Sequence, residues 1–436
     1  MTCSRTSRLF VVCLFFMVIL AGAASAGSAI DLNKARQYFK EISQIIDRDN
    51  GQLWGVRVGG PLLFVDPATR AVAASQADAE GALVDSGGVF VGTLPPEINI
   101  SNTTDNWNGV LWVMLMWPLP EDSLSRDILL AHESWHYVQD KLGLYGQRAT
   151  NAQLEEMQGR LWILLEWRAL DVALDSGPET ARDAIEDALL FRAKRCALYP
   201  DAEEEEKAME LHEGLAEYSG MALACTAETD KTAHAHHMLS MTSGRTSLTR
   251  SFPYASGPAY CLLLDRSGKP WKAKLTDRPT YGALLAEAYG LNLPTVSDDE
   301  LIRRAMKYGY DELLASETER EEQKQLRLKE MRARFVEGPV LILPLRKMNM
   351  SFDPGQVVPV DDKGSVYGNL RMTDVWGILE TTKGGMIGAT FQQTFVPAPE
   401  DPNARPLTGD GWSLELADGW KLSPADRPGD YVLVEE

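Results

Sequence analysis

The chain has 436 residues, with 43 lysines and arginines against 62 aspartates and glutamates, and its net charge is −19 at pH 7. A surplus of negative charge this large argues against nucleic acid and anionic membrane surfaces as partners, because both repel an acidic protein. The length is sufficient for two or three domains.

Residues 1–26 have the features of a secretory signal peptide. Arg5 and Arg8 precede an apolar run over Leu9–Leu20, and Ala24-Ser25-Ala26 forms a small-residue cleavage site. The run is short for a membrane span, and no later run reaches about 18 apolar residues. We expect an exported protein, periplasmic or secreted, without stable membrane insertion after cleavage. An uncleaved N-terminal anchor is the alternative.

Residues 27–120 are expected to form a mixed α/β segment. Ile30–Asp47 has the pattern of an amphipathic helix. Asp66-Pro67 predicts the turn of a hairpin, because both residues favour turns between apolar runs. The strongest strand pattern, over residues 110–117, is apolar on both faces and leads directly into the next helix. Strands are expected over 62–65, 71–73, 88–92 and 110–117.

The run His132-Glu133-Ser134-Trp135-His136 has the form His-Glu-x-x-His, in a chain with only six histidines. On a helix, residues i and i+4 share one face, so both imidazoles can bind one metal ion. Glu133 lies beside the first histidine, where it can take a proton from a metal-bound water. Prolines upstream and Gly143 downstream predict where this helix begins and ends.

Residues 121–335 are expected to form a mostly helical core. Thr150 and Gln153 have the spacing of a capping box, which predicts a helix that starts near Asn151. The segment Ala233–Ser240 contains three histidines but no carboxylate or cysteine, and we interpret it as a polar loop. The three histidines are His234, His236 and His237. The remaining helices are expected over 179–197, 200–226 and 317–334.

Two histidines need at least one further protein ligand, and two carboxylates compete for that role. Glu155 follows His136 closely in the sequence. Glu213 shares one predicted helix face with Glu210 and Glu217, at spacings of i, i+3 and i+7. Small residues on the same face, Gly220 among them, would let two helices approach closely around an ion. Glu217, one turn after Glu213, would orient a ligating histidine through its far ring nitrogen.

The segment Glu213-Gly214-Leu215-Ala216-Glu217-Tyr218 resembles the Asn-Glu-Gly-Phe-Ala-x-Tyr segment of the gluzincin metallopeptidases, known best from alanyl-aminopeptidase-like enzymes. That resemblance implies that Glu213 is the third zinc ligand. Pro253-Tyr254-Ala255-Ser256-Gly257 resembles the family's Tyr-x-x-Gly segment, which implies that Tyr254 stabilises the transition-state oxyanion. The matches cover roughly Val110–Asp265. The spacing of Glu155 after His136 is also one that many zinc aminopeptidases use.

The sequence departs from the family at three points. The segment between His136 and Glu213 is much longer, His212 replaces the usual asparagine, and the Gly-x-Met-Glu-Asn segment that recognises a substrate amino terminus is missing. We therefore do not carry over aminopeptidase specificity. Instead, strand 110–117 is expected to be an edge strand that pairs with the substrate backbone.

From Val340 onward, short apolar runs alternate with Gly, Pro and Asp turns, which predicts a small all-β domain over residues 336–436. Beyond the leader the cysteines are Cys196, Cys225 and Cys261. Their number and spacing permit one disulfide with one free thiol, or three thiols.

These observations predict an α+β protein with a zincin-like, mostly helical catalytic core, a mixed N-terminal segment and a C-terminal β domain. We expect one Zn²⁺ per chain on His132, His136 and Glu213, with Glu133 and Tyr254 catalytic. The expected activity is hydrolysis of peptide or protein substrates. The alternatives are a zinc hydrolase of a non-peptide amide or ester, and a catalytically silent metal-binding module.

Overall fold

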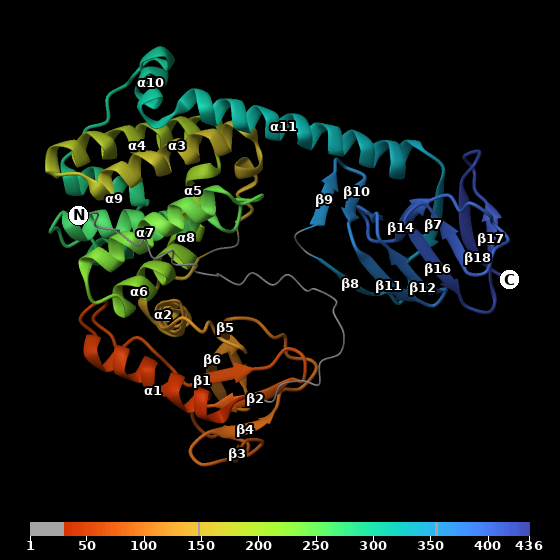
Figure 1. The fold of residues 1–436 in the computed structure, drawn as a ribbon, viewed down its shortest axis with the longest axis horizontal. Coiled ribbons are helices and arrows are strands. Elements are labelled where there is room, and N and C mark those ends of the chain that lie inside the picture. Colours follow the sequence, from red (N-terminus) through yellow and green to blue (C-terminus); the bar gives the residue numbers. More distant parts are fainter. Residues whose placement is uncertain (1–29, 147–148, 354–355) are drawn as a thin grey trace, which may run out of the picture. The chain divides into compact units, whose positions relative to one another are not determined.

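The computed structural model describes residues 30–146, 149–353 and 356–436 and is drawn in Figure 1. The described chain divides into two compact units, one that ends at Glu317 and one that comprises Thr318–Glu436. The first unit combines a helix and a sheet with a helical region, and the second contains mainly strands. The predicted signal peptide, 1–26, lies outside the described residues.

The first unit begins with helix α1 (Leu32–Asp49). The side chain of Asp31 accepts hydrogen bonds from the backbone N–H groups of Asn33 and Lys34, which caps the first turn. Tyr38, Ile42 and Ile46 lie on the buried side of the helix. This confirms the amphipathic helix predicted from the sequence.

A six-stranded sheet follows α1, with the order β3-β4-β2-β1-β6-β5. The predicted hairpin is confirmed, because β1 and β2 pair antiparallel on either side of the Asp66-Pro67 turn. The strands are β1 (Leu62–Val65), β2 (Ala71–Ala74), β3 (Val84–Asp85), β4 (Phe90–Thr93), β5 (Thr103–Trp107) and β6 (Val110–Met116).

The expectation that strand 110–117 forms a sheet edge is wrong. In β6, Val113 pairs with Leu62 of β1 on one side and with Thr104 of β5 on the other. The edge strand on this side is β5. An apolar pattern on both faces is typical of an interior strand, but it reports burial of the faces and not which strands are neighbours.

The helices that follow the sheet pack with it around one hydrophobic core. Helix α2 lies between the sheet and the later helix α6 (Figure 1). The helices are α2 (Ser123–Gln139), α3 (Met157–Asp175), α4 (Pro178–Leu198), α5 (Ala202–Met209), α6 (Leu215–Ala224), α7 (Glu228–Ser243), α8 (Phe252–Arg266), α9 (Tyr281–Tyr289), α10 (Asp298–Ala305) and α11 (Tyr310–Arg332), with 3₁₀ turns η1 (Asp140–Leu142), η2 (Ala152–Glu155), η4 (Lys272–Asp277) and η5 (Met306–Tyr308) and π turns η3 (Glu210–Gly214) and η6 (Ala333–Glu337).

Two local predictions in the helical region are wrong. Thr150 does not cap a helix, because its hydroxyl donates to the carboxylate of Glu205 and α3 begins later, at Met157. The segment Ala233–Ser240 is not a loop but part of α7. The buried residues of α7, Ala235, Met238, Leu239 and Thr242, recur at helical spacing, and this pattern was not used in the sequence-based interpretation.

The second unit contains two sheets, with strand orders β17-β18-β7-β14-β13-β10-β9 and β15-β16-β12-β11-β8. Leu379, Leu414 and Trp376 are fully buried in its main hydrophobic core. This confirms a small β region from Val340 onward. The strands are β7 (Val340–Pro344), β8 (Asn349–Phe352), β9 (Val357–Val360), β10 (Gly364–Tyr367), β11 (Leu370–Asp374), β12 (Gly377–Thr381), β13 (Gly385–Gly388), β14 (Gln393–Pro397), β15 (Leu407–Gly409), β16 (Trp412–Leu416), β17 (Trp420–Pro424) and β18 (Tyr431–Glu435).

Cys196, Cys225 and Cys261 are free thiols, so of the two predicted possibilities the structure contains three thiols. Within the described ranges, no helix combines the length and the apolar character needed to cross a lipid bilayer.

Candidate metal centre

Helix α2 presents the histidine pair. The side chain of Asp122 caps the helix by accepting a hydrogen bond from the Ser125 N–H group, and Gly143 ends the following turn in the left-handed conformation. The apolar side of α2 packs on the core through Trp135, which is fully buried. His132 and Glu133 are also buried, with 4% and 6% of their surface exposed. The predicted helix is therefore present, although α2 itself ends at Gln139 and Gly143 ends the 3₁₀ turn η1 that follows it.

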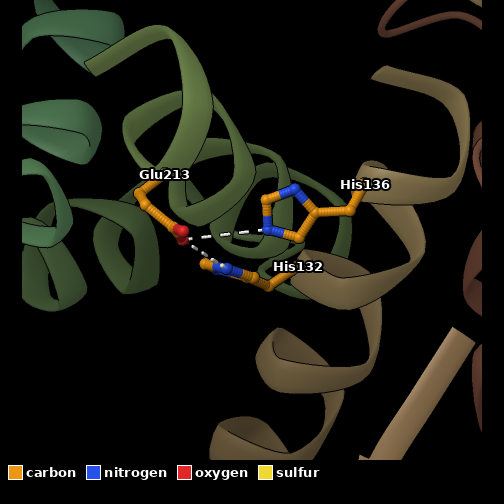
Figure 2. A group of neighbouring side chains, drawn as sticks. All are labelled: His132, His136 and Glu213. Carbon is orange, nitrogen blue, oxygen red and sulfur yellow. Dashed lines mark ion pairs between the residues drawn. The ribbon is translucent and has the colours of Figure 1, made fainter. Parts of the chain in front are cut away.

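Three ligand atoms converge next to α2. His132, His136 and Glu213 each place one nitrogen or oxygen within 4.8 Å of the others. Figure 2 shows the Glu213 carboxylate facing both imidazole rings, with its Oε2 at 3.4 Å from Nε2 of His132 and 3.8 Å from Nε2 of His136. Tetrahedral zinc with bonds of about 2.0–2.2 Å separates its ligand atoms by roughly 3.4 Å. The arrangement therefore fits a small divalent ion after minor adjustment.

Glu213 lies on η3, a π turn that joins α5 to α6. π turns insert an extra residue into a helix and occur often at functional sites. The turn also explains a departure from the predicted helix face. Glu210 does not face the histidines but accepts two hydrogen bonds from the guanidinium of Arg192, at 2.7 and 2.8 Å.

Glycines bring the surrounding helices close together. A Cβ atom at Gly220 of α6 would lie 2.7 Å from the carbonyl oxygen of Ile128 and 3.4 Å from Cβ of His132. A Cβ atom at Gly257 of α8 would lie 2.2 Å from the carbonyl oxygen of Gly214. Both contacts require the absence of a side chain. The predicted role of Gly220 in close helix packing is thus confirmed.

The Nδ1 atom of each histidine, on the side of the ring away from the other ligand atoms, donates a hydrogen bond that fixes the ring. Nδ1 of His132 lies 2.9 Å from Oε2 of Glu217, and Nδ1 of His136 lies 2.8 Å from Oε1 of Gln139. The side-chain amide of Gln139 in turn donates to the carbonyl oxygens of Leu144 and Leu211. These acceptors require the proton on Nδ1, which leaves the lone pair of Nε2 directed at the common point.

Glu217 is almost fully buried, with 7% of its surface exposed. Burial alone would raise the pKa of its carboxyl group, but hydrogen bonds from His132 and His234 lower the pKa to about 2. Glu217 is therefore ionised at neutral pH and accepts a hydrogen bond on each oxygen. The predicted contact between Glu217 and a histidine of the pair is present.

Glu133 differs from the other carboxylates of the centre. Burial raises its pKa above the ordinary value, against the opposing effect of His132 and His136. Its Oε2 atom is buried and has no hydrogen-bond partner among the described residues. A buried carboxylate oxygen without a partner is costly, and such atoms occur at sites that bind or transfer a proton.

Tyr254, on α8, contacts two residues of the centre, Glu213 and His132. Its hydroxyl donates a hydrogen bond of 2.8 Å to Oε2 of Glu213. Its ring stacks on His132, with the ring centroids 5.6 Å apart and the planes 4° from parallel. Burial and the neighbouring Glu213 raise the pKa of Tyr254 well above its ordinary value, so the hydroxyl remains a proton donor.

The structure does not bring Glu155 to the histidine pair. Glu155 lies on η2, where its carboxylate accepts a hydrogen bond from the hydroxyl of Ser247. Of the two carboxylates that the sequence left open, Glu213 is the one adjacent to His132 and His136.

Sequence reasoning missed other neighbours of the centre. The ring of His212 lies 4.9 Å from that of His136, and Nε2 of His234 lies 3.0 Å from Oε1 of Glu217. His236, by contrast, contacts Asp171 and Asp175 of α3. The helical spacing of the buried α7 residues could have revealed that His234 and His236 point differently, because helix positions two residues apart diverge by about 200°.

Comparison with known proteins returns no match to this chain among family models, curated proteins or solved structures. The chemistry of the centre must therefore be inferred from its own atoms.

Proposed function

We propose that this chain is an exported zinc-dependent hydrolase of gluzincin type that cleaves peptide bonds. One observation carries the proposal: two imidazole Nε2 atoms and one carboxylate oxygen converge, and the residue after the first histidine, Glu133, has a buried Oε2 with no hydrogen-bond partner in the described part of the chain. Two histidines and one glutamate are a common donor set of catalytic zinc, which keeps a fourth position open.

Zinc held by His132, His136 and Glu213 would lower the pKa of a bound water and polarise a substrate carbonyl. Glu133 would take a proton from the attacking water and deliver it to the leaving amine. Its raised pKa suits both steps, because the group must accept a proton and then release it. General acid–base catalysis of this kind contributes typically about 10²–10⁴-fold to a rate.

Tyr254 would donate its hydroxyl proton in a hydrogen bond to the developing oxyanion. Its protonated hydroxyl and its position against Glu213 and His132 support this role. The substrate backbone would pair with β5, because an extended peptide can add to a sheet edge and β5 is the edge strand that contacts α2.

The test is digestion of a diverse peptide mixture, analysed by mass spectrometry, by the zinc-loaded chain beside its Glu133→Gln variant. Equal zinc content and equal far-ultraviolet circular dichroism would show that the variant keeps its fold and its metal. We expect cleavage by the wild type and a rate at least about 10²-fold lower in the variant.

Two results would overturn the proposal. Equal rates for the wild type and Glu133→Gln would remove the role of Glu133. A zinc-loaded wild type that cleaves no peptide would overturn the peptidase activity, and hydrolysis of amide and ester model compounds would then separate a different hydrolase from a silent metal-binding module.

A further inference from the structure

Glu217 lies between two histidines from different helices. Its Oε2 is 2.9 Å from Nδ1 of His132 on α2, and its Oε1 is 3.0 Å from Nε2 of His234 on α7. All three side chains are nearly buried, with exposed side-chain fractions of 5% for His132, 9% for Glu217 and 11% for His234. The three residues thus form a chain of hydrogen bonds from the metal centre to α7.

A buried carboxylate needs a donor for each oxygen, because an unsatisfied charged atom costs more than a neutral one. His132 supplies one donor and His234 the other. Without His234, Oε1 of Glu217 would be left buried, and the carboxylate could rotate toward another partner. Such a rotation would also change the hydrogen bond that fixes the ring of His132.

We propose that His234 is a positioning residue of the metal centre, which holds the Glu217 carboxylate so that Glu217 can orient the ring of His132. This inference rests on the proposed metal-binding function. His234 would not touch metal or substrate. It would act through Glu217, and its contribution would be measured as metal affinity and ligand geometry.

The chain offers a matched control two residues away. His236 lies on the same helix, but both of its ring nitrogens contact carboxylates of α3, at 2.5 Å from Asp171 and 2.9 Å from Asp175. His236→Leu therefore removes the same type of side chain from the same helix, and it also breaks contacts between two helices. It leaves intact the chain of hydrogen bonds that leads to His132.

The experiment measures zinc dissociation constants by competition with a chromogenic chelator for the wild type, His234→Leu, His234→Gln and His236→Leu. Loss of a partner behind a metal ligand typically weakens binding about 10–100-fold, and we expect this for His234→Leu. Gln keeps an N–H donor, so His234→Gln should recover part of the affinity. His236→Leu should bind zinc within about 3-fold of the wild type, because among the described residues His236 shares no partner with the metal centre, and sites without shared partners are nearly independent in energy.

A second readout is the visible absorption of Co²⁺ bound in place of zinc, which depends on ligand geometry. His234→Leu should change this spectrum, and His236→Leu should leave it unchanged. If His234→Leu does not fold, the comparison proceeds with His234→Asn, which is polar but too short to reach Glu217.

A double-mutant cycle separates the proposed chain from a general packing effect. In a Glu217→Gln background, His234→Leu should cause little further loss of zinc affinity, because the link to His132 has already been changed. Additive losses would overturn the inference, as would wild-type zinc affinity and an unchanged Co²⁺ spectrum in His234→Leu.

The outcomes also separate this inference from the proposed function. Zinc binding that is insensitive to His234 would overturn the inference and leave the hydrolase proposal standing. A zinc affinity that depends on His234 in a chain that cleaves no substrate would support the inference and overturn the hydrolase. A wild type that binds no zinc would overturn both.

Discussion

His132 and His136 differ in the group that holds each ring. An ionised carboxylate, Glu217, accepts the hydrogen bond from His132, whereas a neutral amide, Gln139, accepts that from His136. A carboxylate behind a histidine makes the ring more electron-rich than an amide does. His132 is therefore expected to be the stronger of the two proposed metal ligands.

The choice between Glu213 and Glu155 as third ligand can be tested directly. Loss of a residue that hydrogen-bonds to a metal ligand typically weakens metal binding roughly 10–100-fold. Glu213→Gln should weaken zinc binding by more than this, because the substitution removes a negatively charged ligand atom. The control is Glu155→Gln, the same substitution at a residue that accepts a hydrogen bond from Ser247 and lies away from the histidine pair. This variant should bind zinc normally. Wild-type zinc affinity in a folded Glu213→Gln would contradict the assignment.

Tyr254→Phe removes one hydroxyl and keeps the ring that stacks on His132. If the hydroxyl stabilises the oxyanion, kcat should fall by about 10²–10³-fold while KM changes little, as with loss of one oxyanion donor. Steady-state kinetics at equal zinc content would measure this. An unchanged kcat would assign Tyr254 a packing role only.

At the scale of elements, the position of Glu213 depends on how η3 packs against α8. A Cβ atom at residue 257 would lie only 2.2 Å from the carbonyl oxygen of Gly214. Gly257→Ala should therefore lower the free energy of unfolding by about 1–3 kcal/mol through overpacking, and should also weaken zinc binding, because η3 must move.

The control for this change is Gly244→Ala at the end of α7. Its φ is −80°, and the nearest atom to an added Cβ would be 3.8 Å away. Urea unfolding should show little change for Gly244→Ala. Equal midpoints for the wild type and Gly257→Ala would show that α8 and η3 can separate without cost.

Helices α3 and α7 are joined by His236, whose two ring nitrogens contact Asp171 and Asp175. Burial alone would lower the pKa of His236, but the hydrogen bonds to these aspartates raise the pKa above its ordinary value of 6.5. For a base with a raised pKa, the stabilisation is complete below the unfolded-state pKa and is lost as the pH rises through the folded-state pKa.

We therefore expect His236→Gln to be less stable than the wild type at pH 6, and the difference to disappear as the pH rises through the raised folded-state pKa of His236. Both aspartates are substantially exposed, with 48% and 74% of their side-chain surface accessible, so solvent limits the difference to below about 1 kcal/mol. Urea unfolding across this pH range would measure the effect. A difference that grows with pH would contradict the sign.

At the scale of the whole molecule, the two compact units have separate hydrophobic cores. Calorimetry of the intact chain should therefore show two transitions, of which only that of the first unit responds to zinc. At a free zinc concentration 100 times the dissociation constant, binding stabilises by about 2.7 kcal/mol, which a chelator should remove.

The transitions can be assigned with Leu414→Ala, because Leu414 is fully buried in the second unit. This substitution should lower the second unit's stability by about 2–5 kcal/mol and leave the zinc-sensitive transition in place. A single transition that shifts with both zinc and Leu414→Ala would show that the units unfold together.

Much of the chain's local structure was predictable from the sequence. The amphipathic α1, the β1–β2 hairpin, α2, the Gly143 end of the turn after it and the β region after Val340 all follow from periodicity and turn residues. These signals are local, because each depends on residues within a few positions of one another. The position of His132, Glu133 and His136 on one helix belongs to the same class.

Only the tertiary structure decided which distant residues join that helix. Glu217 and His132 are 85 positions apart, and no periodicity specifies that α6 passes α2 at Gly220. The interior position of β6, the exclusion of Glu155 and the contact between His234 and Glu217 were likewise decided by packing. Hydrophobic spacing determines which face of an element is buried, but the partner across that face is selected by the shape and burial of the whole core.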